Sequence, residues 1–250
     1  MPRSQRPKGY VIWEGLSPLD NKPLVAIAIM QSTNTKTGNM VQVYILRSDI
    51  NPVEAVNNGE DFSICGDCPH RKNTETGKRS CYVNVGQGPN AVYKAFKADK
   101  YPRFSYAEHG NVWLNKSIRF GAYGDPALLP EWLVKAMIGL CQLKDAHTGY
   151  THQWRRFQNF AGIFMASCET EHERLAAQSL GFKTFSVIHP DNHAPNYAKQ
   201  CPATVTNSRA KCETCKLCDG LKLDIFVTAH GSGKNYVNNH DRKVSLPAFV

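Results

Sequence analysis

The middle of the chain twice shows the pattern strand, helix, strand, and this pattern restricts the possible folds more than any other feature. A buried strand is predicted for "SIRFGAYG" (117–124), followed by the helix "LPEWLVKAMIGLC", whose apolar residues have helical spacing. A second strand, "GIFMASC" (162–168), leads to the capped helix "TEHERLAAQSLG" (170–181) and the strand "FKTFSVI" (182–188). Short connections of this kind join parallel strands. We therefore expect an α/β fold with a partial (βα) barrel of mostly parallel strands.

The two ends of the chain add strands to this core. Three apolar runs in the first 50 residues, "YVIWEG", "LVAIAIM" and "MVQVYILRSD", alternate with polar residues and turns, which is typical of strands. A short helix is expected from Pro52, and "LKLDIFVTAHG" predicts a last strand. We divide the chain into an N-terminal β-rich segment packed on the core (1–60), an α/β barrel-like core with a first cysteine set (61–190), and a C-terminal cysteine-rich segment with the final strand (191–250).

Composition limits the class of protein. With 250 residues, 42% of them hydrophobic and 20% charged, the chain is expected to be globular rather than disordered. Its apolar runs fall short of the roughly 20 residues of a membrane span. The stretch "MPRSQRPKGYVIWEG" also lacks the apolar centre of a secretory signal, so we expect a cytoplasmic protein without a membrane partner. In a reducing compartment, clustered thiols are metal ligands or catalytic groups more often than disulfides.

The first cysteine set lies in "CGDCPHRKNTETGKRSC" and consists of Cys65, Cys68 and Cys81. A Cys-x2-Cys turn directs two thiolates toward one metal centre, and the loop that follows returns a third. Three ligands leave one coordination position open, which is typical of reactive metal sites. The alternative is a structural Cys3His zinc site completed by His70.

The second cysteine set lies in "CPATVTNSRAKCETCKLC" and has four members, which is enough to close a metal site: Cys201, Cys212, Cys215 and Cys218. Three cysteines at x2 spacing with a remote Cys-Pro resemble the bacterial ferredoxin run in reversed order. This favours a [4Fe-4S] cluster over zinc, which remains the alternative. Of the two other cysteines, Cys141 falls in an apolar helical run and is expected in the core.

Polar side chains follow the predicted parallel strands at the ends where α/β folds bind ligands. Cys168 and Glu169 follow one of these strands, and Cys168 could supply a further metal ligand. The candidate catalytic residues, each of which could also be a mere strand terminus, are Asp125, His152, His189 and His230.

The stretch from residue 71 to 119 contains ten Lys or Arg and three acidic residues, a net charge of +7. Such a concentration predicts a polyanionic partner, a nucleic acid or nucleotide first, although a solvated basic face is the alternative. Five aromatic residues lie among these charges and suit either single-strand stacking or core packing: Tyr93, Phe96, Tyr101, Phe104 and Tyr106.

The order of these parts resembles that of radical S-adenosylmethionine (radical-SAM) enzymes, particularly cysteine-rich phage-encoded members. The matching parts, in order between about residues 63 and 230, are "CGDCPHR", the downstream "SCYV", the helix "GPNAVYKAF", and the strand and turn "RFGAYGDPALLP". The resemblance implies that Cys65, Cys68 and Cys81 bind a [4Fe-4S] cluster. It also implies that Gly124 and Asp125 contact the cofactor, and that the four C-terminal cysteines hold an auxiliary cluster. The family spacing C-x3-C-x2-C is replaced here by C-x2-C-x12-C, so the cluster loop must differ in conformation.

These features predict an iron-sulfur enzyme, radical-SAM-like, that acts on a nucleic acid or nucleotide in the cytoplasm, the host's if the chain is phage-encoded. One alternative is a zinc-binding nucleic-acid-binding protein with two structural cysteine sites. Another is a zinc-containing barrel that modifies bases, similar in outline to the transglycosylases.

Overall fold

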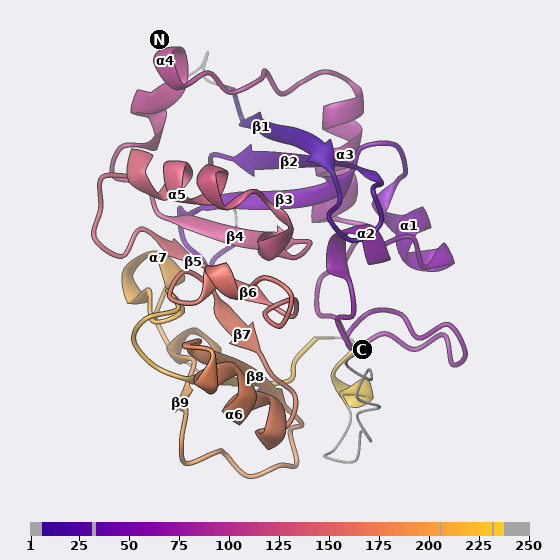
Figure 1. The fold of residues 1–250 in the computed structure, drawn as a ribbon, viewed down its shortest axis with the longest axis vertical. Helices are drawn as coiled ribbons and strands as arrows, with labels where there is room; N and C mark the ends of the chain where they lie inside the picture. The colour runs from indigo at the N-terminus through magenta and orange to yellow at the C-terminus, as the bar shows by residue number, and fades with distance from the viewer. Residues whose placement is uncertain (1–6, 32–33, 206, 232, 238–250) are drawn as a thin grey trace.

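The structure, a computed structural model, describes residues 7–31, 34–205, 207–231 and 233–237. Its first sheet has five strands in the order β1-β2-β3-β4-β5 (Figure 1). The alternating N-terminal runs form an antiparallel meander from β1 to β3, and β4 and β5 then continue parallel to β3. The bounds are β1 Gly9–Leu16, β2 Pro23–Ile29, β3 Val41–Arg47, β4 Ile118–Tyr123 and β5 His147–Thr148.

The second sheet also has five strands, in the order β6-β7-β8-β10-β9, and all of its pairings are parallel. Its bounds are β6 Tyr150–Thr151, β7 Met165–Ser167, β8 Thr184–Ile188, β9 Lys199–Gln200 and β10 Ile225–Thr228. Only Gly149 separates β5 from β6, so the chain passes directly from the edge of one sheet to the edge of the other. A Cβ at Gly149 would lie 2.6 Å from the Phe164 ring, which explains the glycine at this close approach.

The mixed α/β class is confirmed, whereas the partial barrel is not. Within the described residues the strands form two open sheets, and β1 and β9 are edge strands that do not pair with each other. Within these residues the strands do not close into a complete barrel, because antiparallel β2 pairs with the side of β3 where a closed parallel barrel would continue.

Capping residues in the sequence explain where the helices begin. Asn51 caps α1 by accepting from the Val53 amide, and Thr170 and Glu173 form a complete capping box at α6. The helices predicted from Pro52, after Pro130 and after Thr170 are confirmed. The bounds are α1 Pro52–Asn58, α2 Phe62–Cys65, α3 Gly88–Lys97, α4 Tyr106–His109, α5 Glu131–Leu140, α6 Glu171–Ser179 and α7 Cys212–Cys215. In the described part of the chain, none of the helices is long and apolar enough to cross a membrane.

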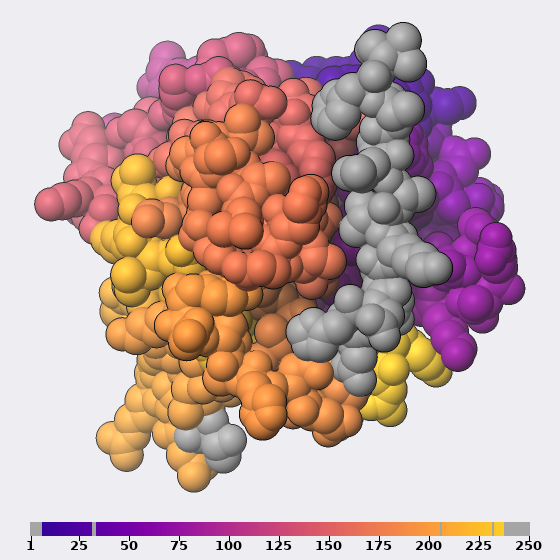
Figure 2. Space-filling model, turned by 60° about the horizontal axis from the view of Figure 1, so that its bottom comes forward, coloured from indigo at the N-terminus to yellow at the C-terminus, as the bar shows by residue number. Residues whose placement is uncertain are grey.

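The larger of two hydrophobic clusters among the described residues joins the predicted segments. Val25 and Ile27 of β2 belong to the same buried cluster as Phe120 of β4 and Phe164 and Phe182 around the second sheet. The N-terminal strands are therefore integral to the first sheet and its core. The space-filling view shows the second sheet's segments, orange, and the region of residues 50–80, purple, on opposite sides of one face (Figure 2).

Candidate functional site

A cavity of about 320 Å³ lies at the carboxyl ends of the parallel strands. Asp125 after β4, His152 after β6, Ser167 at the end of β7 and His230 after β10 all line it. Cysteines of both sets line the same cavity: Cys65, Cys68, Cys81, Cys201 and Cys212. The two sets are far apart in sequence, yet the fold brings them to one space.

The first cysteine set is built from a short helix and a returning loop. Cys65 ends α2, Gly66 turns the chain with φ of 55°, and the Cys68 amide donates to the Cys65 carbonyl at 3.3 Å. The Cys81 amide donates to the His70 carbonyl at 3.0 Å, which closes the long loop. Burial raises the pKa of the Cys65 thiol well above its usual value, and Cys68 raises it further. The Cys65 thiol is therefore neutral at pH 7 unless a metal deprotonates it.

The second cysteine set surrounds a smaller cavity of about 20 Å³, which all four of its members line. Cys212 and Cys215 begin and end α7, and the Cys212 amide donates to the Lys36 carbonyl at 2.9 Å. The Cys218 carbonyl accepts from the Gly149 amide at 3.2 Å, at the passage between the sheets. Burial raises the pKa of the Cys218 thiol, and Cys201 adds to the shift. All four cysteines of this set therefore lie around one small cavity, and their role as a closed metal site stays a prediction.

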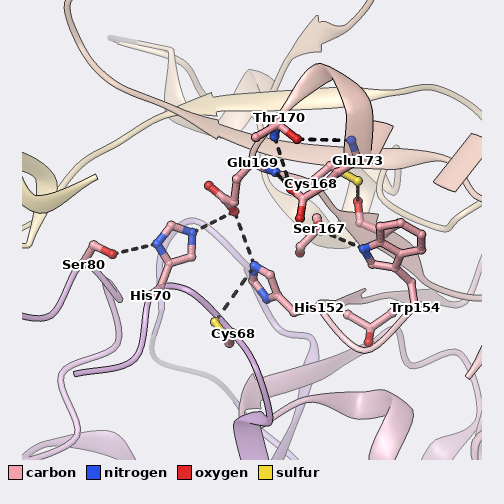
Figure 3. A network of polar contacts seen from close by, with 12 residues as sticks. Cys68, His70, Ser80, His152, Trp154, Ser167, Cys168, Glu169, Thr170 and Glu173 are labelled. Atoms are coloured by element: carbon pink, nitrogen blue, oxygen red, sulfur yellow. Dashed lines mark hydrogen bonds and ion pairs between the residues drawn. The ribbon is translucent and has the colours of Figure 1, made fainter. Parts of the chain in front are cut away.

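A half-buried carboxylate joins two histidines that line the site (Figure 3). Glu169 Oε1 lies 3.1 Å from His70 Nε2 and 3.4 Å from His152 Nε2. Ser80 Oγ lies 2.8 Å from the other ring nitrogen of His70, and Cys68 Sγ lies 4.0 Å from His152 Nε2. The ligand atoms of His70, His152 and Glu169 all lie within 4.8 Å of one another, close enough to hold one metal ion.

The opposite charges of Glu169 and the histidines explain the pKa shifts in this network. Burial raises the pKa of Glu169, but the hydrogen bonds with His152 and His70 lower it more, so its pKa falls well below the ordinary value. Burial lowers the pKa of His152, but Cys68 and Glu169 raise it more, so its pKa lies well above the ordinary value. In the absence of a metal, Glu169 is therefore ionised and His152 protonated at neutral pH.

The turn at Gly124 and Asp125 connects the first cysteine set to His152. Gly124 has φ of +80°, and a Cβ there would lie 2.7 Å from the Ile45 carbonyl oxygen. Asp125 donates its amide to the Ile64 carbonyl at 2.7 Å, and its carboxylate accepts from the amides of Ala127 at 3.0 Å and His152 at 2.8 Å. Burial raises the pKa of Asp125. The carboxylate therefore positions backbone around the cavity.

The other candidate residues are more dispersed. His189 lies after β8, outside the cavity lining, and its Nδ1 is 3.4 Å from the Asp191 carboxylate. His230 lines the cavity and stacks on the Tyr82 ring with centroids 6.0 Å apart. Cys168 is buried beside β7, outside the cavity lining, and its thiol faces the Ala166 carbonyl at 3.6 Å. Cys141 is buried in the core, as predicted, and burial raises the pKa of its thiol to about 12.

The basic stretch does not form one uniform face. Arg71 pairs with Asp61, Arg79 donates to the Cys81 and Val83 carbonyls, and Arg103 pairs with Glu14. Four of the five interleaved aromatic residues pack in or against the core: Tyr93, Phe96, Tyr101 and Phe104. Core packing therefore accounts for these four, and the nucleic-acid partner remains a prediction that rests on exposed lysines.

The structure adds residues that sequence reasoning does not assign. Glu169 follows a predicted strand, but only the fold shows that its carboxylate lies between His70 and His152. Arg119 is one charge of the basic stretch in the sequence, and in the structure it lines the cavity. Its place in a strand between Ile118 and Phe120 is the signal that could have found it, because a charged residue there must face away from the core.

No known protein family, curated protein or solved structure matches this chain.

Proposed function

We propose that the protein is an iron-sulfur enzyme whose reactive centre is held by Cys65, Cys68 and Cys81 in the wall of the cavity. The observation that carries this proposal is that the whole first cysteine set and two members of the second line one cavity at the carboxyl ends of parallel strands. A [4Fe-4S] cluster on three thiolates would supply an open iron position, which could bind S-adenosylmethionine, and one-electron chemistry. The partial (βα) barrel belongs to the same proposal, and the parallel strands on both sides of Gly149 support it.

The residues present fit a cluster on this side of the cavity. The Tyr123 hydroxyl is buried without a hydrogen-bond partner among the described residues, and it lines the cavity near Cys65. A cluster sulfur would accept such a hydrogen bond, and hydrogen bonds to the sulfurs tune cluster potentials. The second cysteine set supplies four thiols around one small cavity, and these four would be the ligands of a closed auxiliary cluster.

The remaining site residues have supporting roles in this proposal. His152, protonated and facing the cavity, is the proton donor best placed beside the first cysteine set. Glu169 orients it, and Asp125 fixes its backbone. The Gly124–Asp125 turn would contact the cofactor through its backbone, since both oxygens of the Asp125 carboxylate already accept from amides.

Metal content and cofactor cleavage test the proposal. Protein purified without oxygen should contain iron and sulfide and absorb broadly in the visible range. Cys65→Ala should remove about four iron atoms per chain, whereas Cys141→Ala, outside both sets, should keep them. Dithionite-reduced wild-type protein should convert S-adenosylmethionine to 5′-deoxyadenosine, and Cys65→Ala should not. Colourless anaerobic protein that contains zinc would overturn the proposal.

A second candidate is a single-metal enzyme centred on His70, His152 and Glu169. The separations of 3.1 and 3.4 Å suit neighbouring ligands of one ion, because bonds of about 2.1 Å place such atoms about 3.0 to 3.4 Å apart. Ser80 would orient His70 through its second nitrogen. Zinc that is lost in His70→Ala but kept in Cys65→Ala would favour this candidate, and iron with sulfide that persists in His70→Ala would exclude it.

A further inference from the structure

Arg119 brings a positive charge into the cavity from β4 of the first sheet. It lies in β4 between Ile118 and Phe120, which are both fully buried in the core. Because side chains alternate along a strand, Arg119 projects to the opposite side, where it lines the cavity. The sheet thus holds the base of this long side chain rigidly.

No fixed anion compensates this charge among the described residues. The guanidinium donates a hydrogen bond to the Tyr82 hydroxyl, and Tyr44 and Tyr150 are its other phenolic neighbours. Burial raises the pKa of both Tyr44 and Tyr150, so these phenols stay neutral at pH 7. In the described ranges of the chain, no carboxylate forms an ion pair with Arg119. A half-buried guanidinium in a cavity wall without a counter-charge favours an anionic ligand.

The rest of the cavity lining does not supply a counter-charge for Arg119 either. Lys36 also lines it, whereas Asp125 is the one carboxylate among the described lining residues. Both oxygens of that carboxylate accept hydrogen bonds from backbone amides and face their donors rather than Arg119. A ligand with a negative group is therefore attracted to the Arg119 end of the cavity.

Aromatic side chains line the cavity next to this charge. Tyr150 and Phe185 stack with centroids 4.2 Å apart and planes at 28°. Tyr82, itself bonded to Arg119, stacks on His230. Flat aromatic surfaces bind nucleobases by stacking, and a guanidinium binds phosphate through two parallel hydrogen bonds. A volume of about 320 Å³ suits a small molecule rather than a folded polymer.

We infer that the cavity binds a mononucleotide, with its phosphate on Arg119 and its base against the aromatic side chains of the wall. This inference names the substrate class of the proposed enzyme and rests on the proposed function for the role of the cavity. Binding of the mononucleotide itself requires neither of the two proposed iron-sulfur clusters. The anion could instead be the charge of a cluster on the second cysteine set, because the Cys212 thiol lies near Arg119.

Calorimetric titration of the anaerobically purified full chain tests the inference, with AMP, adenosine and inorganic phosphate as probes. Wild-type protein should bind AMP more tightly than adenosine, and phosphate should compete with AMP. Arg119→Gln should weaken AMP binding about 10- to 100-fold and leave adenosine binding unchanged, since it removes a charge-assisted hydrogen bond. Arg119→Lys should retain part of the affinity. Lys144→Gln, at an exposed lysine outside the cavity lining, is the matched control and should bind as wild type does.

Other outcomes separate this inference from its alternatives and from the proposed function. Equal affinities of the wild type for AMP and adenosine, or unchanged AMP binding in Arg119→Gln, would overturn it. Loss of iron in Arg119→Gln without any AMP binding by the wild type would identify Arg119 as the counter-charge of a cluster instead. If Arg119→Gln does not fold, the inference is tested by AMP binding to Arg119→Lys and by competition between phosphate and AMP in the wild type. Iron-free protein that binds AMP through Arg119 would refute the proposed function and leave this inference standing.

Discussion

At the scale of single residues, Glu169 connects the two histidines of the site, because its Oε1 contacts both His70 and His152. Charge complementarity holds this arrangement together: an ionised carboxylate faces a protonated His152 in a mostly buried network. The stability that it contributes must therefore depend on pH.

Glu169→Gln, which keeps the shape and removes the charge, should lower the free energy of unfolding of the metal-free protein by about 1 to 3 kcal/mol near pH 6. Because the pKa of Glu169 is lowered on folding, its contribution is present above the ordinary carboxyl pKa and disappears as the pH falls through the folded value. Because the pKa of His152 is raised, its contribution is present below the ordinary imidazole pKa and disappears as the pH rises through the folded value.

The difference between Glu169→Gln and wild type should therefore be greatest in the weakly acidic window and shrink on both sides. Urea unfolding across pH measures it, with exposed Glu75→Gln as the control. A difference that does not vary with pH would contradict the ion-pair explanation.

Gly124 offers a second test at the residue scale. Gly59 and Gly124 have similar positive φ values of 83° and 80°, but a Cβ meets nothing within 4 Å at Gly59 and meets the Ile45 oxygen at 2.7 Å at Gly124. Gly59→Ala should cost about 1 to 2 kcal/mol from backbone conformation alone. Gly124→Ala should cost about 1 to 3 kcal/mol more because of the close approach. Equal costs in denaturant unfolding would show that the turn relaxes.

At the scale of elements, the helices were the most predictable part of the fold and the short strands the least. The signals of α1 and α6 lie within a few residues of each helix end, so they act before any tertiary contact forms. The strand predicted over 162–168 extends only over Met165–Ser167, because residues 158–164 form turns around buried Phe160 and Phe164. Tertiary packing of these rings overrode the local apolar pattern.

Thr170→Ala tests whether α6 supports the site as an element. Loss of the capping box should lower the free energy of unfolding by about 0.5 to 2 kcal/mol. Because Glu169 precedes Thr170 and donates its amide to Glu173 at 2.7 Å, amide hydrogen exchange should also quicken around Glu169. Ser179→Ala at the other end of α6 is the control. Faster exchange along all of α6 in both variants would argue against a local role of the cap.

At the scale of the whole molecule, the basic stretch separates into structural arginines and exposed lysines. If the protein also binds single-stranded nucleic acid, the exposed lysines Lys94, Lys97 and Lys100 at α3 are the available phosphate-binding groups.

Replacing Lys94, Lys97 and Lys100 with Gln together should weaken binding of a single-stranded oligonucleotide. The slope of log K against log salt should shrink by about 0.7 for each phosphate that the variant no longer neutralises. Fluorescence anisotropy over a salt series measures both effects. The matched control replaces three exposed lysines in other parts of the chain: Lys135, Lys144 and Lys199. An unchanged slope in the α3 variant would remove this face from the nucleic-acid hypothesis.

The sequence by itself determined the features that depend on near neighbours: the capped helices, the alternating N-terminal strands, the Cys-x2-Cys turns and the excess of positive charge. Only the tertiary structure decided which of these features lie close together in space. It placed Glu169 against His70, which is 99 residues away, and brought both cysteine sets to one cavity. It also left Arg119 among phenols without a carboxylate in the described ranges. The physical reason is that local signals arise from backbone hydrogen bonds and side-chain periodicity. Contacts between residues far apart in the chain depend instead on strand order and on the direct passage between the sheets at Gly149.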